Sequence, residues 1–327
     1  MTLPAARSGA ARDSSRDAAA DDPLRGLAHR REVAQPPAPY RLQRAAPDGV
    51  MRRRGGLLER IVIEDGQIVL LRAAQPVRDG EVVMGAWAPE ELLAEQALAR
   101  WRRTLGVDVD HRPFLDAAWH DPLLAPLVRA RPWMRPAVRY RPHEALLWAI
   151  TEQLIEYVEA ARIQRGLVRL AGVQCPRTGL RDAPTPQAIL GLAPARIEAL
   201  GLSARRTMLL REVCRLLARG LDLDADDRLP AQRRLRSIRG IGAWTLACMA
   251  LRGQGDPDAS PSGDLGLLKV VGRFMADGRA PAPADGTDPA ARDRRERLPL
   301  ATPEQVHDLM APYAPWRGYA AEHLLWA

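Results

Sequence analysis

Apolar and polar positions along this chain follow two different periods, one typical of strands and one typical of helices. Residues 61–63 and 68–71 are short apolar runs, and an Asp-Gly pair between them is a strong signal for a hairpin turn. Residues 81–84 add a third strand-like run. Residues 89–105 then place apolar side chains on one face of a helix. Together these segments predict a small α/β domain over residues 39–112.

The rest of the chain shows helical spacing, with apolar residues recurring every three or four positions. Short segments with proline and glycine separate most of the predicted helices. The helices are predicted over residues 113–130, 142–171, 186–191, 194–199, 203–219, 231–237, 243–253, 264–275, 303–310 and 316–326. The fold class is therefore predicted to be α+β, a small β-rich N-terminal domain followed by a mainly helical domain over residues 113–327.

Two segments carry few large apolar side chains. Residues 1–38 are rich in alanine, arginine, aspartate and proline, and residues 277–298 have a similar composition. Such segments bury too little apolar surface to offset the entropy of ordering the chain. We predict that residues 1–38 form a disordered tail and that residues 277–298 form a flexible insertion between two packed helices.

Length and composition exclude several classes of protein. The chain has 327 residues, of which 46% are hydrophobic, and no apolar run approaches the roughly 18–20 residues that a membrane span needs. The N-terminus lacks the apolar centre of about 7–15 residues that a secretory signal carries. We therefore expect a cytoplasmic protein without a membrane partner.

Charge and cysteine content limit the partners and the metal sites that the chain can be expected to have. The formal net charge of +8 favours a polyanionic partner, because neutralising phosphates supplies most non-specific affinity for DNA. The same charge also fits a general compositional bias toward arginine, since Lys269 is the only lysine. Cys175, Cys214 and Cys248 form no C-x-x-C pair, which excludes a zinc site of the usual spacing and a four-cysteine iron–sulfur cluster.

The most informative motif spans residues 235–247, Leu-Arg-Ser-Ile-Arg-Gly-Ile-Gly-Ala-Trp-Thr-Leu-Ala. It is typical of two helices joined by a tight turn, in which Gly240 and Gly242 let the backbone approach a ligand closely. Free N–H groups at the start of the second helix would bind a phosphate oxygen. Asp264 follows Trp244 by 20 residues. A phosphate anchor and a placed carboxylate together indicate chemistry on DNA, although the two glycines also fit an ordinary helix–helix turn.

These motifs resemble the helix-hairpin-helix DNA glycosylase superfamily, and most of all its 3-methyladenine DNA glycosylase II branch. Residues 143–155 are similar to the branch's helix ending in Gln-Leu, and residues 314–320 to its C-terminal signature. The resemblance covers residues 90–327 well and residues 40–88 weakly. It implies a monomeric, nucleoid-associated enzyme of base excision repair that flips alkylated purines out of double-stranded DNA and hydrolyses their N-glycosidic bond without a required cofactor.

Within that resemblance Asp264 is the expected catalytic residue. A carboxylate near the sugar stabilises the positive charge of the transition state and can orient the attacking water. The alternative is that Asp264 only caps the helix that follows it, and a cap would also fix its carboxylate. Trp244 stands where bifunctional members carry a nucleophilic lysine, which implies no lyase activity. Its indole is expected to line the pocket of the flipped base, or alternatively to pack in the core.

Gln153 and Leu154 match the family's Gln-Leu pair, whose apolar member fills the space left by the flipped nucleotide. Leu154 also fits a buried stripe at helical spacing. That stripe would consist of Leu147, Ile150, Leu154, Tyr157 and Val158. The family often carries glycine or glutamine where this chain has Glu152, and we expect Glu152 to point away from DNA because its charge would repel phosphates.

The remaining expected site residues lie in the hairpin and at the C-terminus. DNA contacts are expected at Ile238, Arg239, Gly240, Ile241 and Gly242. The resemblance implies that the backbone carbonyls of Arg236, Ile238 and Ile241 hold a monovalent cation that bridges to a DNA phosphate. The family's C-terminal pocket aromatic aligns with Leu325, and Trp326 is adjacent, so both are candidate base-pocket residues. Core packing is expected for Trp316 and Tyr319.

Two other functions stay open at this point. The first is a non-catalytic helix-hairpin-helix protein that only binds DNA, against which the intact Gly-Asp-Leu-Gly segment at residues 263–266 argues. The second is a glycosylase for another damaged or mismatched base. The absence of the lysine and of the iron–sulfur cysteines argues against its usual versions.

Overall fold

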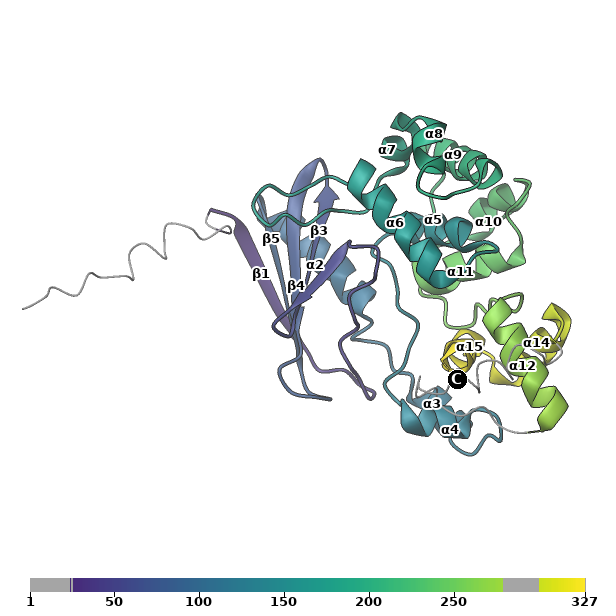
Figure 1. Ribbon diagram of the computed structural model, residues 1–327. Helices are drawn as coiled ribbons and strands as arrows, with labels where there is room; N and C mark the ends of the chain where they lie inside the picture. The colour runs from purple at the N-terminus through teal and green to yellow at the C-terminus, as the bar shows by residue number, and fades with distance from the viewer. Residues whose placement is uncertain (1–23, 25, 279–299, 327) are drawn as a thin grey trace, which may run out of the picture.

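The computed structural model describes residues 24, 26–278 and 300–326, and it places a β-sheet beside two groups of helices (Figure 1). The sheet is antiparallel, with strand order β1-β5-β4-β3-β2. Its strands are β1 (Ala28–Ala34), β2 (Met51–Arg54), β3 (Leu57–Glu64), β4 (Gln67–Ala74) and β5 (Val82–Ala88). The predicted hairpin is confirmed as β3–β4, with Asp65 and Gly66 in the left-handed region at φ 48° and 76°. The α+β fold class is therefore confirmed.

The prediction of a disordered tail was wrong for residues 28–34, which form the edge strand β1. Its side chains are mostly polar and exposed, and its order comes from backbone pairing with β5. An edge strand needs little apolar surface of its own, which is why the hydrophobic pattern missed it. The rest of the tail up to residue 23 lies outside the described residues, as do residues 279–298 of the predicted insertion.

Helix α2 (Glu91–Leu105) packs against the sheet and completes the first core. Its buried side chains include Leu93, Leu98 and Trp101. The Trp101 indole N–H also donates to the carbonyl of Arg72 on β4, over 3.3 Å. This helix confirms the one predicted over residues 89–105.

The other helices form two groups with separate hydrophobic cores. The hairpin lobe contains α5 (Pro142–Glu152), α6 (Tyr157–Ala171), α7 (Pro186–Gly191), α8 (Pro194–Glu198), α9 (Ala204–Ala218), α10 (Leu229–Arg236) and α11 (Ala243–Gly253). The terminal lobe contains α3 (Arg112–Ala118), α4 (Ala125–Ala130), α12 (Leu265–Asp277), α14 (Pro303–Met310), the 3-10 helix η1 (Ala311–Tyr313) and α15 (Arg317–Leu325). In Figure 1 the terminal lobe lies below the hairpin lobe. No helix among the described residues is long and apolar enough to cross a membrane.

Two predicted helices are each divided in the structure. The helix predicted over residues 142–171 is broken after Glu152, because Leu154 adopts a left-handed backbone conformation with φ 57°. The helix predicted over residues 113–130 is broken between α3 and α4, where the Asp121 carboxylate accepts hydrogen bonds from the N–H groups of Leu123 and Leu124. Hydrophobic spacing continued across both breaks and therefore did not reveal them.

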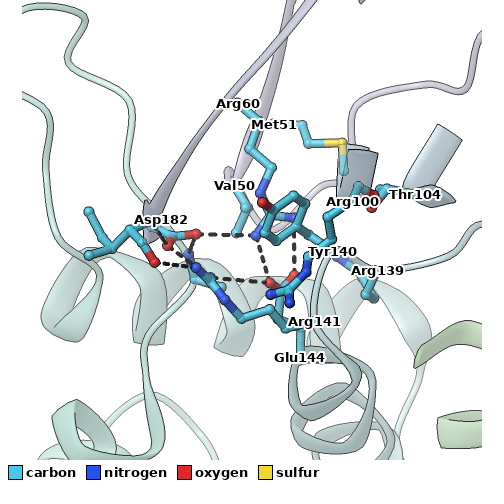
Figure 2. Close-up of polar contacts among 12 residues, drawn as sticks. Val50, Met51, Arg60, Arg100, Thr104, Arg139, Tyr140, Arg141, Glu144 and Asp182 are labelled. Carbon is cyan, nitrogen blue, oxygen red and sulfur yellow. Dashed lines mark hydrogen bonds and ion pairs between the residues drawn. The ribbon is translucent and has the colours of Figure 1, made fainter. Parts of the chain in front are cut away.

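A buried ionic network joins the sheet to the hairpin lobe (Figure 2). The guanidinium of Arg60 on β3 is fully buried and forms two hydrogen bonds to the Glu144 carboxylate, of 2.6 and 3.1 Å. It also contacts Asp182, which follows α6, over 3.1 Å. Asp182 in turn accepts from the backbone N–H of Ile63 and from the Arg141 side chain. Because every charge in the network has an opposite partner, the buried groups are compatible with a stable interface.

Replacing Glu144 with alanine is expected to lower the free energy of unfolding by about 3–5 kcal/mol, because it leaves the Arg60 guanidinium buried with a single carboxylate. Urea unfolding followed by circular dichroism would measure the loss. Glu81 is exposed, so Glu81→Ala is the matched control and should change stability by less than about 0.5 kcal/mol. A loss below about 1 kcal/mol in Glu144→Ala would contradict this account of the interface.

Candidate active site between the two helical lobes

The hairpin between α10 and α11 is fixed by the core beneath it. The side chains of Ile238 and Ile241 are buried in the hairpin lobe, and the Ile241 N–H donates to the Ile238 carbonyl over 3.0 Å. Gly240 has φ 107°, and a Cβ at this position would lie 3.0 Å from a methyl group of Leu209. Glycine is therefore required here by both backbone conformation and space.

The hairpin exposes a positively polarised surface. Gly242 caps α11 without a side-chain hydrogen bond, and within the described parts of the chain no acceptor pairs with the N–H groups of Ala243, Trp244 or Thr245. These groups lie at the positive end of the helix dipole, which favours an anion. The exposed arginines nearby are Arg233, Arg234, Arg236 and Arg239. The geometry thus suits a phosphate group.

Asp264 is held by donors from both helical lobes. One carboxylate oxygen caps α12 by accepting from the N–H of Gly266 over 2.8 Å. The other oxygen accepts from the indole N–H of Trp244 over 3.2 Å. The capping role is therefore present, and it fixes the carboxylate beside the hairpin. Trp244 itself is half-buried and is not among the buried residues of either core.

The two C-terminal candidates have different surroundings. Leu325 is half-buried against the first turn of α12, where a Cβ on Gly266 would lie 2.8 Å from a Leu325 methyl group. Trp326 is 55% exposed, and its indole N–H donates to the Glu322 carboxylate over 3.2 Å. Leu325 is thus the one next to the Asp264 turn. Trp316 is partly buried and packs edge-on against the buried Tyr319 in the core of the terminal lobe.

The turn between α5 and α6 brings the predicted Gln-Leu pair next to the hairpin. The Gln153 side-chain amide donates to the carbonyl of Gly240 over 2.9 Å and to the Thr245 hydroxyl over 3.1 Å. The next side chain, Leu154, is 100% exposed. The interpretation of Leu154 as part of a buried stripe is therefore wrong, as it is for Tyr157 and Val158, because the stripe ends with α5.

Glu152 is half-buried at the end of α5, and its carboxyl group makes no hydrogen bond or ion pair that the structure describes. Burial raises the pKa of its carboxyl group, which the nearby Arg252 and Arg139 lower and the carboxylates of Asp264 and Glu322 raise. Glu152 is therefore not freely solvated, and it lies close enough to the Asp264 carboxylate to interact with it electrostatically. The structure makes it a neighbour of the site, which the sequence pattern had not indicated.

The other chemistry-bearing residues show no sign of a metal or thiol site. Among the described residues, no three or more histidine, cysteine or acidic side chains are grouped so that they could hold a metal ion. All three cysteines are free and buried. Burial raises the pKa of Cys214 to about 12 and also raises the pKa of Cys248, so neither thiol is activated as a nucleophile.

Comparison with known proteins finds relatives whose names refer to DNA repair or to a DNA glycosylase. The chain is 30% identical over 232 residues to the probable bifunctional transcriptional activator/DNA repair enzyme AlkA of Mycobacterium tuberculosis, covering 70% of this chain and 42% of that protein. It is 24% identical over 277 residues to a DNA-3-methyladenine glycosylase of Bacillus subtilis, covering 82% and 80%. No protein-family model matches the chain.

Among solved structures, the 3-methyladenine DNA glycosylase of Archaeoglobus fulgidus has the same fold. It superposes with a TM-score of 0.69 at 19% identity, over 90% of this chain and 97% of that one. The chain therefore has the fold of that glycosylase. Its sequence relatives include proteins named as DNA-3-methyladenine glycosylases.

The environment of Glu152 predicts a pH-dependent gain in stability for Glu152→Gln. Its raised pKa means that the folded protein favours the protonated carboxyl group, so ionisation lowers stability as the pH rises through and above the ordinary glutamate value of about 4.3. Glu152→Gln should be more stable than the parent at pH 7, and the difference should shrink below about pH 4.

Thermal and urea unfolding at both pH values would measure this difference. Glu95 is exposed on α2, so Glu95→Gln serves as the control and should show no comparable gain. A Glu152→Gln variant that is no more stable than the parent at pH 7 would contradict the assignment.

Proposed function

We propose that this chain is a monofunctional DNA glycosylase that hydrolyses alkylated purines, of the 3-methyladenine type, from double-stranded DNA. The observation that carries the proposal is the Asp264 carboxylate, held between the Gly266 N–H and the Trp244 indole beside the hairpin. The names of the relatives, a DNA repair enzyme and a DNA-3-methyladenine glycosylase, support the same activity. Every group in the proposal comes from one chain, so one copy suffices.

In this proposal the hairpin binds the DNA backbone while the damaged nucleotide is flipped out of the duplex. The free N–H groups at the start of α11 bind a phosphate, and Leu154 fills the space that the nucleotide leaves. Filling that space offsets the few kcal/mol that unstacking costs. The bonds from Gln153 to Gly240 and Thr245 keep Leu154 at a fixed distance from the phosphate site.

The chemical step needs only a fixed negative charge. Cleavage of the N-glycosidic bond develops positive charge on the sugar, which a carboxylate stabilises most when it needs no reorganisation. Two donors already hold Asp264, and a carboxylate has about four lone-pair sites, so acceptor capacity remains for the attacking water. An alkylated, cationic purine leaves as a neutral base and therefore needs little acid catalysis. The Trp244 ring offers a face that attracts such a cation.

We further propose a monovalent cation at the hairpin. The carbonyl oxygens of Arg236 and Ile241 accept no hydrogen bond from the described residues, and the Ile238 carbonyl accepts only one, which leaves it a lone pair. Backbone carbonyls are hard oxygen ligands that suit such an ion. When bound, the cation would add positive charge for a DNA phosphate.

Asp264→Asn is expected to reduce release of 3-methyladenine and 7-methylguanine from methylated duplex DNA by about 10²–10³-fold. DNA affinity should change only a few-fold, because the amide retains the cap and removes the charge. Quantifying free bases by chromatography and affinity by fluorescence anisotropy would separate the two effects. Asp226 is exposed, and Asp226→Asn is the matched control that should retain the parent rate.

Three results would overturn parts of this proposal. Equal release by the parent and Asp264→Asn would remove Asp264 from the reaction. DNA binding without base release from either protein would indicate a protein that only binds DNA. Release of an oxidised or mismatched base, with methylated bases retained in the duplex, would assign a different substrate.

Borohydride is expected to trap no covalent complex between this protein and abasic-site DNA. Trp244 has no amine to form a Schiff base, and Lys269, the only lysine, lies five residues beyond Asp264 with an exposed side chain. Denaturing gel electrophoresis after borohydride treatment would make the measurement. A trapped complex that disappears in Lys269→Arg would show lyase chemistry and contradict the monofunctional assignment.

A further inference from the structure

The start of α6 exposes apolar side chains that the proposed reaction has not used. Tyr157 is 53% exposed and Val158 is 79% exposed. They follow the fully exposed Leu154 by three and four positions. We call Tyr157 and Val158 the α6 apolar pair. Three large apolar side chains exposed within five residues form a patch of the kind that marks an interaction surface.

Tyr157 is held rigidly although it is exposed. Its ring stacks on Trp148, with ring centroids 5.8 Å apart and an interplanar angle of 24°. Trp148 is 6% exposed, and its indole N–H donates to the buried Asp48 carboxylate over 3.0 Å. The Arg139 guanidinium lies 4.7 Å from the Trp148 ring centre and also pairs with Asp48. A ring already fixed in this way loses little conformational entropy when it contacts a ligand.

The α6 apolar pair also has a fixed position relative to the hairpin. Gln153 ties the turn before α6 to Gly240 and Thr245, and only three residues separate Gln153 from Tyr157. A duplex whose phosphate binds at the start of α11, with Leu154 inserted, must pass over this turn. The DNA at the lesion therefore lies within reach of the exposed part of the Tyr157 ring.

We infer that Tyr157 stacks on the base of the opposite strand that loses its pairing partner when the damaged nucleotide is extruded. This inference rests on the proposed function. Leu154 occupies the vacated position in the damaged strand, so the base across from it is the one base near the turn with no pairing partner. Every base has a π-face, so an aromatic ring can hold it whatever its sequence. The larger face of a purine gives the stronger contact.

Two duplexes test the inference without any base release. Each carries a tetrahydrofuran abasic-site analogue in one strand, opposite adenine in the first duplex and opposite a second abasic analogue in the other. The parent should bind the first duplex more tightly in fluorescence anisotropy titrations. Tyr157→Ala should lose about tenfold in affinity for the first duplex and none for the second. Tyr157→Phe, which keeps the ring, should match the parent on both.

Controls separate this contact from general DNA binding. Leu154→Ala should weaken binding to both duplexes, whereas Val77→Ala, an exposed apolar residue beside the sheet, should change neither. The inference is overturned if the parent does not distinguish the duplexes, if Tyr157→Ala loses equally on both, or if Tyr157→Phe falls as far as Tyr157→Ala. If the parent distinguishes the duplexes but releases no methylated base, the proposed function fails while the Tyr157 contact stands.

Discussion

The docking of the sheet on the hairpin lobe depends on the buried guanidinium of Arg60. It lies between the carboxylates of Glu144, at the start of α5, and Asp182, after α6. Burying such charges costs several kcal/mol per ion and is offset only in a geometry that satisfies all of them. These contacts therefore favour one arrangement of the sheet against the hairpin lobe. Because α5 carries Gln153 and Leu154 beyond its other end, that arrangement also helps to orient the turn proposed to meet DNA.

The second constraint is the junction of the two helical lobes. Trp244 comes from one lobe and Asp264 from the other, and the hydrogen bond between them makes the position of the proposed catalytic carboxylate dependent on both. An ion pair of 3.1 Å between Arg252 on α11 and Glu322 on α15 joins the lobes a short way along the same helix. The hairpin lobe and the terminal lobe thus both contribute to one candidate site, although their cores are separate.

Much of this arrangement was predictable from local sequence, because its signals are local. The Gly-x-Gly turn and the Asp-Gly hairpin act within a few residues, and Asp264 follows Trp244 by 20 residues. Strand β1 was missed because its order comes from pairing with β5, whose partner residues lie 48 to 60 positions further along the chain. The break at Leu154 was missed because apolar spacing continues through it, and the bond from Gln153 to Gly240 exists only once the helices have packed.

The left-handed backbone at Leu154 has a further consequence. A leucine with φ 57° is strained, whereas glycine adopts this conformation freely. The Leu154 side chain is fully exposed and contributes no packing in return. Selection for thermal tolerance alone would therefore favour glycine at this position and would discard the side chain proposed to enter DNA. Leu154 marks a point where directed evolution for heat resistance and directed evolution for repair would lead to different proteins.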